Sequence, residues 1–289
     1  MSMISHTLKK LPKNTYEILV SIPKDEITKE YEKAFVKLQE NLTVEGFRKG
    51  KAPREIAEKN LPRQDVYQQV IQDLLPEVYA EIVKKEGITP VISPKVDLVK
   101  AKEGEDWELK IEVAEKPSID LSNYKEVVKK AKLEAKKPEI WTPGSTPKAE
   151  NPEEKKQDHL NEVLSALLKE VKIEISELII DQELNHRLTR LVDDIQKIGL
   201  TVDGYLKSKN MTMEDMRKQF SNEIEETYKL EFLLGEIADK ENIQVADEDL
   251  QKLFTNLKSE ENKKQAQQNA YFYASIIRKQ KTLDYILVL

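Results

Sequence analysis

The apolar positions at the start of the chain follow first the period of a strand and then that of a helix. A strand is predicted over residues 14–22, because every second residue from Tyr16 to Ile22 is apolar. An amphipathic helix is predicted from Ile27 to Leu42, where apolar residues recur at helical spacing. This alternation predicts a domain that contains both strands and helices.

A second pair of helices and a hairpin continue this pattern. Pro53 is a suitable first residue for a short helix over 53–59, and a long helix over 64–85 follows, with Pro76 inside it and Gly87 as its C-cap. The apolar stripe of the long helix consists of Val66, Val70, Leu74, Val78 and Ile82. Two strands are expected next, carrying Val96 and Leu98, then Trp107, Leu109, Ile111 and Val113, joined by a turn over 102–105.

The last part of the chain is helical in pattern from Glu153 onward. Ser176 caps a helix that Gly199 ends, and Thr212 with Asp215 forms a variant capping box for a helix to about Lys240. The first of these two helices carries Leu184, Leu188, Leu191, Ile195 and Ile198 as its stripe. Further helices are predicted over 153–171, 247–257 and 260–289, with a short extended piece at 172–175. These patterns predict an extended all-α domain with helical arms, rather than a compact bundle.

The segment between these two parts has a different composition. Residues 117–132 are expected to be extended, and a semi-stiff linker follows, in which prolines recur from Pro138 to Pro152. Trp141 is expected to dock on a neighbouring domain rather than to stack on a ligand. The predicted organisation is an α+β domain, a small antiparallel sheet with helices, over 1–116, a connection over 117–154, and a helical domain over 155–289.

The composition limits what the chain can be. Its 289 residues carry a formal net charge of −6, with 35% charged residues and no cysteine, so a disulfide framework and thiolate chemistry are excluded. The acidity argues against a general nucleic-acid binder, so any RNA contact must be local. The first 12 residues lack the apolar run of a signal peptide, and no 18-residue apolar stretch occurs, so a cytosolic protein without membrane contact is expected.

One short run stands out from this acidic background. Between Gly46 and Pro53 the sequence reads Gly-Phe-Arg-Lys-Gly-Lys-Ala-Pro, so two glycines frame a turn that carries an aromatic ring and two cations, and a third cation follows. An exposed loop of this kind suits a polyanionic surface with an apolar niche. The alternative is an ordinary basic hairpin with Phe47 turned into the local core.

This run resembles the ribosome-docking signature of the trigger factor family, G-F-R-x-G-K-x-P, at all six fixed positions. Weaker resemblances follow in the family's order, at residues 63–66, 115–121 and 233–237. The resemblance implies a chaperone of the nascent-chain exit tunnel. Its expected partners are the large ribosomal subunit (ribosomal protein and rRNA), nascent or unfolded polypeptides and, off the ribosome, a second copy in a homodimer. The ribosome-binding residues that it implies are Gly46, Phe47, Arg48, Lys49, Gly50, Lys51 and Pro53.

The middle of the chain departs from the family pattern. Members usually carry a prolyl-isomerase domain of the FK506-binding type there, which needs on the order of 100 residues. Between Tyr124 and Asp158 the sequence offers only the proline-rich linker, and no proline pocket can be built from Tyr124 and Trp141 alone. Isomerase activity is therefore not expected.

No other chemistry is indicated by the sequence. The histidines, His6, His159 and His186, are far apart and lack partners at metal-ligand spacing. The run over 46–52 is not a phosphate-binding loop, since Glu45 and Ala52 stand where such a loop needs Gly and Ser or Thr. We expect no catalytic residue, no metal and no cofactor, and hence no enzyme.

Two groups of apolar residues are candidates for contact with unfolded chains, because flexible apolar side chains tolerate many sequences. They are Met211, Met213 and Met216 at one helix start, and Tyr271, Phe272, Tyr273 and Ile276 in the last helix. For the methionines, a hydrophobic staple between Met211 and Met216 is the favoured interpretation, and for the aromatic group core packing remains equally open.

Two other classes of function remain as alternatives. One is a folding catalyst that keeps a degenerate isomerase activity. The other is a ribosome-independent holding or assembly chaperone, against which the intact loop argues, since fold stability does not require Phe-Arg-Lys at an exposed turn.

Overall fold

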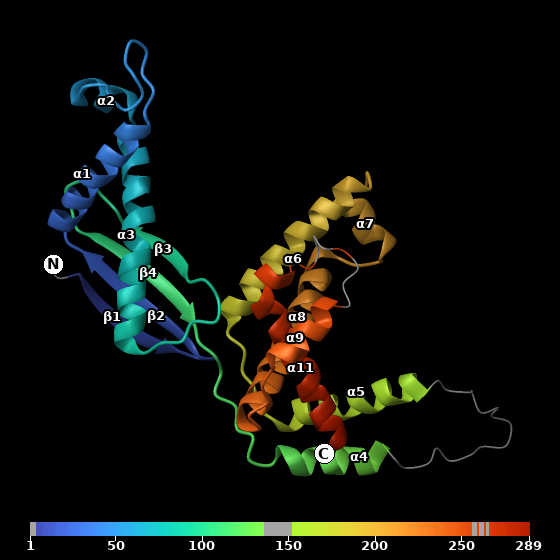
Figure 1. Ribbon diagram of the computed structural model, residues 1–289. Helices are drawn as coiled ribbons and strands as arrows, with labels where there is room; N and C mark the ends of the chain where they lie inside the picture. Colours follow the sequence, from blue (N-terminus) through green and yellow to red (C-terminus); the bar gives the residue numbers. More distant parts are fainter. Residues whose placement is uncertain (1–3, 136–151, 256–258, 260–262, 264–265) are drawn as a thin grey trace. The chain divides into compact units, whose positions relative to one another are not determined.

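The computed structural model describes residues 4–135, 152–255, 259, 263 and 266–289. The chain forms two compact units (Figure 1). The first consists of residues 1–116 with Ser176–Ile179, and the second of residues 117–175 and 180–289. Each unit is described by itself below.

The first unit is built on a four-stranded antiparallel sheet with the strand order β1-β2-β4-β3. Its strands are β1 (Ser5–Leu11), β2 (Thr15–Ile22), β3 (Lys95–Lys100) and β4 (Trp107–Ala114). Ile18 of β2 pairs with Leu8 on one side and with Ile111 on the other, and Ile111 pairs in turn with Val96. Residues opposite each other share a face, so Ile18 and Ile111 enter the same core and Val96 packs against it, whereas Leu8 on the edge strand stays exposed.

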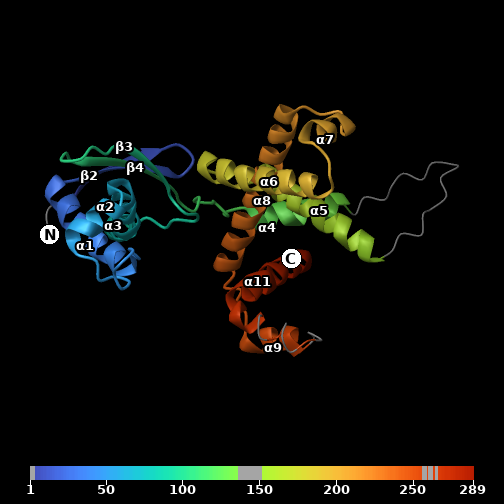
Figure 2. The ribbon, with the colours of Figure 1, turned by 90° about the horizontal axis from the view of Figure 1, so that it is seen from above.

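The helices α1 (Lys24–Asn41) and α3 (Arg63–Glu86) lie on one face of this sheet (Figure 2), and the short helix α2 (Arg54–Asn60) lies beyond the sheet, at the loop end of α1 and α3 (Figure 1). All five predicted stripe residues of α3 are buried, in one core with residues of α1, β2 and β4. Gly87 ends α3 in the left-handed conformation with φ of 67°. The predicted α+β architecture is confirmed.

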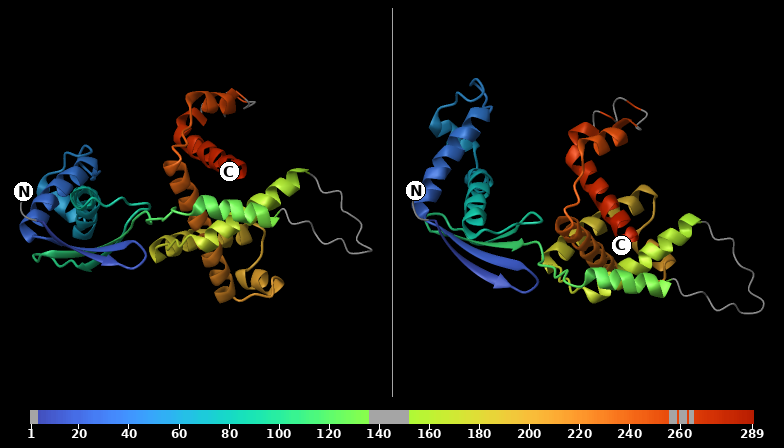
Figure 3. Two further views of the ribbon diagram at one scale, coloured as in Figure 1. Left: turned by 90° about the horizontal axis from the view of Figure 1, so that it is seen from below. Right: turned by 60° about the horizontal axis from the view of Figure 1, so that its bottom comes forward.

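Helices make up the second unit. They are α4 (Tyr124–Ala135), α5 (Pro152–Glu170), α6 (Glu177–Lys197), α7 (Val202–Ser208), α8 (Met213–Lys240), α9 (Asp247–Thr255) and α11 (Ala270–Val288). The first residues of α6, up to Ile179, belong to the first unit. α4 packs along α5 (Figure 3), while α11 packs against α8 and α9. The expected capping box is present, since Thr212 accepts from the Asp215 amide at 3.1 Å and Asp215 accepts from the Thr212 amide at 3.0 Å.

Tyr124, Glu241 and Tyr285 join α4, the end of α8 and α11 through one carboxylate. The two phenols each donate to Glu241 at 2.6 Å, and Lys125 pairs with it at 2.8 Å. These hydrogen bonds, led by that of Lys125, lower the pKa of Glu241 to about 2. The charge of Glu241 therefore stabilises the packing of these helices.

Several expectations about the elements were wrong. Residues 117–132 are not wholly extended, because α4 begins at Tyr124 and buries Tyr124, Val128 and Ala131 at helical spacing. The last helix does not run from 260 without a break, since Asn269 is a turn residue before α11. Pro152 begins α5 instead of belonging to the linker. The rest of the predicted linker, with Trp141, lies outside the described residues.

β1 was missed because its sequence carries little apolar alternation. It is an edge strand whose residues are mostly exposed, and its full ladder with β2 holds it in place. Within the described part of the chain, no helix combines the length and the apolar character needed to cross a membrane.

Candidate functional site

The loop between α1 and α2, residues 42–53, carries the predicted docking residues. Gly46 and Gly50 both adopt positive φ, 84° and 76°, which an L side chain rarely adopts. The Gly50 amide donates to the Leu42 carbonyl at 2.9 Å, and the Phe47 amide donates to the Val44 carbonyl at 3.1 Å. The loop is therefore a hydrogen-bonded turn, closed across its base.

The two glycines have different surroundings. A Cβ atom at Gly50 would lie 2.4 Å from the backbone oxygen of Glu40, in the last turn of α1, whereas a Cβ at Gly46 would meet nothing within 4 Å. Gly50 thus allows the second half of the loop to pass close to the end of α1. Gly46 is required only for its backbone angle.

The C-terminal side of the loop is anchored to α1 by Gln39 and Arg54. The Gln39 side-chain amide donates to the Ala52 carbonyl at 2.8 Å, and Ala52 is buried. Arg54 donates to both carboxylate oxygens of Glu32 at 2.7 and 2.8 Å, and to Glu58 at 2.7 Å. These bonds raise the pKa of Arg54 and lower that of Glu32.

Arg54 also lies over the ring of Phe35, at 5.1 Å from the ring centroid. Its guanidinium is thus engaged within the fold by Glu32, Glu58 and the Phe35 ring. Pro53 is exposed and is the N-cap of α2 rather than its first helical residue, which corrects the expected helix start by one residue.

The tip of the loop presents Phe47 and three cations. Phe47 is 39% exposed, so it is not turned into the local core. Arg48, Lys49 and Lys51 are exposed, and none of them forms an ion pair with a residue that the structure describes. The loop therefore combines an accessible ring with three cations that are available to an external anion.

The methionine group divides into exposed and buried members. Met213 is 37% exposed and Met211 is half-buried, whereas Met216 is only 4% exposed. Met216 is a core residue at the start of α8 and is not accessible to a client chain. Because the staple positions coincide with an intact capping box, the burial of Met216 is what a helix start of this type requires.

The aromatic group of α11 is largely exposed. Tyr271, Phe272 and Ile276 have exposed fractions of 91%, 60% and 45%. Tyr273 is half-buried and packs edge-on against Phe254 of α9. The group thus forms an accessible apolar surface supported by one packed ring.

The sequence did not identify Ile198 and Leu200 as accessible apolar residues. They are 67% and 47% exposed, on either side of Gly199, although Ile198 was assigned to the buried stripe of its helix. The C-cap at Gly199 could have indicated this exposure, because residues beside a helix end no longer follow the helical period that places the stripe on the buried face.

The histidines do not form a site in the described structure. Among the described residues, His6 has one side-chain partner, Glu86, whose carboxylate lies 2.9 Å from the His6 Nε2 atom. Among the residues that the structure describes, no group of three or more His, Asp or Glu side chains could hold a metal ion.

Two family descriptions match the chain, one after the other. Residues 4–142 match Bacterial trigger factor protein (TF), and residues 146–287 match Bacterial trigger factor protein (TF) C-terminus. Only residues 143–145 lie between the two matches, whereas a domain needs about 100 residues. No isomerase domain is found between the two parts.

Curated relatives and a solved structure agree with this result. The trigger factor of Listeria welshimeri is 38% identical over 112 residues, which are 39% of this chain and 26% of that protein. That of Lactiplantibacillus plantarum is 39% identical over 114 residues, with the same shares. These alignments span about a quarter of the relatives' length.

The fold is similar to a solved structure that is described as showing promiscuous substrate recognition in the folding and assembly activities of the trigger factor chaperone. The TM-score is 0.65 at 16% identity, covering 98% of this chain and 99% of that one. At this identity the likeness concerns the fold alone, whereas the two family matches together extend over nearly the whole sequence. The chain belongs to the trigger factor family, with its N-terminal and C-terminal parts and without the isomerase domain between them.

Proposed function

We propose that this protein is a ribosome-associated chaperone that docks at the exit tunnel through the tip of its 42–53 loop and holds emerging unfolded polypeptides. The observation that carries the proposal is the contrast within the loop. Arg54 is held by two carboxylates, while Arg48, Lys49 and Lys51 are exposed and unpaired among the described residues. Unpaired cations lose no internal ion pair when they bind phosphate or carboxylate.

Phe47 supplies the apolar part of the proposed contact. The ring is accessible on a turn that is closed by hydrogen bonds at both ends, so little conformational entropy is lost when it enters a niche. Arg48 can bind a carboxylate or phosphate through two parallel hydrogen bonds, which Lys49 and Lys51 cannot do. The loop therefore offers specificity through Phe47 and Arg48 and added charge through the lysines.

The exposed apolar residues of the second unit are the proposed client surface. Tyr271, Phe272 and Ile276 on α11 and Met213 at the start of α8 are accessible, and Ile198 and Leu200 extend the set. Scattered apolar side chains on a polar background give weak, exchanging contacts with many sequences. On this proposal residues 1–116 form the ribosome-binding domain and residues 155–289 the chaperone domain, and the protein works without prolyl-isomerase activity.

Co-sedimentation with bacterial ribosomes tests the docking. The test variant carries Phe47→Ala, Arg48→Ala and Lys49→Ala, and the charge-matched control carries Lys84→Ala and Lys85→Ala, exposed residues at the other end of α3. We expect the test variant to lose most ribosome binding and the control to keep it. Equal binding by both would mean that the loop is not the anchor and would favour a ribosome-independent chaperone.

Photo-crosslinking to an unfolded model protein tests the client surface. Crosslinkers at Tyr271 or Phe272 are expected to capture the client, and a crosslinker at the exposed Leu133 of α4 serves as the control. Equal capture at Leu133 would show that the client binds non-specifically to any exposed apolar side chain. Absence of capture at α11, with capture elsewhere, would remove this surface from the proposal.

A further inference from the structure

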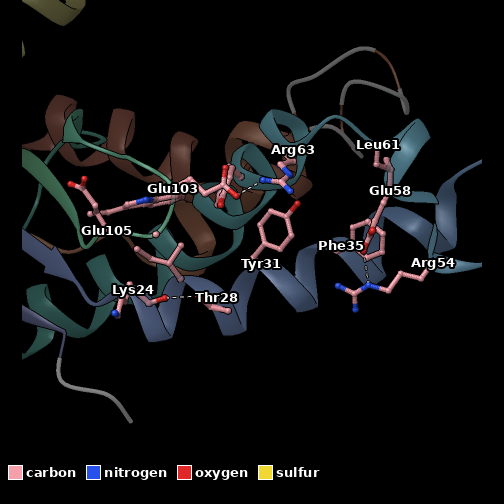
Figure 4. A pocket seen from close by; sticks show the side chains of 14 residues that line it. Lys24, Thr28, Tyr31, Phe35, Arg54, Glu58, Leu61, Arg63, Glu103 and Glu105 are labelled. Atoms are coloured by element: carbon pink, nitrogen blue, oxygen red, sulfur yellow. Dashed lines mark hydrogen bonds and ion pairs between the residues drawn. The ribbon is translucent and has the colours of Figure 1, made fainter. Parts of the chain in front are cut away.

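A surface pocket of about 460 Å³ lies in the first unit, beside the docking loop but separate from its tip (Figure 4). Its walls come from α1, α2, α3, the β3–β4 turn and β4. The volume lies within the range of small-ligand and peptide pockets, which is about 300–1,000 Å³. Neither the ribosome contact nor the proposed client surface uses it.

One wall of the pocket is aromatic. Tyr31 of α1, Tyr67 of α3 and Trp107 of β4 form a continuous row, with ring centroids 4.8 Å apart in the first pair and 5.5 Å apart in the second. Both tyrosines are half-buried, and Trp107 is 4% exposed. A rigid row of rings gives a preformed stacking surface.

The carboxylates that line the pocket are already paired. Glu58 accepts from Arg54, Glu103 from Arg63, and Glu105 lies 2.8 Å from Lys100. Arg54 and Arg63, two of the three cations that line the pocket, are engaged in these same ion pairs. A cationic ligand would thus find no free carboxylate, and the phosphates of an RNA would lie next to three glutamates.

The polar groups that remain available are donors. The hydroxyls of Tyr31 and Tyr67, the indole N–H of Trp107 and the ammonium of Lys24 make no side-chain hydrogen bond or ion pair in the described structure. Burial raises the pKa of both phenols, so they keep their protons at neutral pH. The pocket therefore calls for a ligand that is rich in acceptors and poor in donors.

We propose that this pocket binds a proline-rich segment of an extended polypeptide. A proline residue has a carbonyl acceptor but no backbone N–H, so it satisfies donors without bringing a donor that needs a partner. Its ring packs flat against aromatic side chains, and a proline-rich segment is already extended, so binding costs little conformational entropy. Tyr31 and Tyr67 provide the stacking wall and two donors to peptide carbonyls, and the buried Trp107 ring supports this wall from below.

The test uses the full chain with Trp141→Phe, which leaves Trp107 as the single tryptophan. An acetylated decaproline peptide is titrated while Trp107 fluorescence is followed, with calorimetry as a second readout should the emission not respond. A Gly-Ser decapeptide and a ten-nucleotide uridine RNA are the comparison ligands. We expect saturable binding of decaproline alone, and this experiment needs no ribosome, so it is independent of the docking proposal.

Removal of single hydroxyls tests the donors. Tyr31→Phe and Tyr67→Phe keep the rings, and each is expected to weaken decaproline binding by about 2- to 10-fold, the usual net effect of one hydrogen bond. Tyr79→Phe is the matched control, because the Tyr79 hydroxyl is buried, without a partner, and outside this pocket. The proposal would be overturned if the Gly-Ser peptide bound as well as decaproline, if RNA bound better, or if neither readout showed binding. Equal affinities of all three variants for decaproline would also overturn it.

Discussion

The two loop glycines make a matched pair, and Gly50→Ala is expected to be the more damaging change. Both positions have positive φ, so an alanine at either costs about 1–2 kcal/mol of backbone strain. At Gly46 the added methyl group meets open space, and the strain is the whole effect.

At Gly50 two further costs follow from the structure. The new Cβ would lie 2.4 Å from the Glu40 oxygen, so the loop must move away from α1 by about 1 Å to reach an ordinary contact distance. That movement breaks the 2.9 Å hydrogen bond from the Gly50 amide to the Leu42 carbonyl, which contributes about 0.5–1.5 kcal/mol. The expected loss of unfolding free energy is about 2–3 kcal/mol for Gly50→Ala.

Urea unfolding measures this difference. Trp107 lies in the core of the same unit as the loop, so its fluorescence in a Trp141→Phe background reports the unfolding of that unit. Ribosome affinity is expected to fall in the same order, although neither variant changes a charge. Equal destabilisation by Gly46→Ala and Gly50→Ala would refute the role of the close approach to Glu40.

Two further predictions concern the second unit. Because the folded pKa of Glu241 is about 2 and its ordinary value is 4.5, its charge stabilises the fold above pH 4.5, and this stability is lost as the pH falls from 4.5 towards 2. After allowance for solvent screening the contribution is about 1–2 kcal/mol, and Glu241→Gln should remove it. The unfolding free energies of the wild-type protein and of this variant, measured by urea titration, should therefore converge at low pH. A difference that stays constant with pH would contradict this. Thr212→Ala should cost about 1 kcal/mol by removing the cap on α8, whereas Thr212→Ser should restore most of it in the same assay; equal stability of the two variants would contradict the role of the hydroxyl.

Much of the fold could be predicted where periodicity and end signals agree. The stripe of α3 is fully buried as expected, because residues four apart share one helix face. The capping box at Thr212 and the C-cap at Gly87 are confirmed, because these signals act through neighbouring backbone atoms only.

The sequence failed where distant partners decide the structure. β1 is a strand because β2 pairs with it, and its own residues show little alternation. α4 is amphipathic, but its lysines and paired valines obscured the buried positions that pack on α5 and near Glu241. Such elements are determined by tertiary contacts rather than by local propensity.

The candidate site was predicted in its residues but not in their roles. The loop motif singled out the ring and the cations, yet only the structure distinguishes Arg54, which is bound to Glu32 and Glu58, from the three cations that form no ion pair with a described residue. The exposure of Ile198 was missed, because periodicity does not show where a helix face lacks a packing partner. The burial of Met216 agrees with the favoured hydrophobic staple and removes this residue from the candidate client surface.

The salt dependence of ribosome affinity tests the central claim most directly. If Arg48, Lys49 and Lys51 each meet one phosphate, log K should fall with log salt with a slope of about 2–3, which is about a 20- to 40-fold loss between roughly 50 and 200 mM. The variant with Phe47, Arg48 and Lys49 changed to alanine should bind weakly with a slope near 1, while the Lys84→Ala, Lys85→Ala control keeps the full slope. Salt-insensitive binding, or the same slope in the loop variant and the control, would contradict docking through this loop.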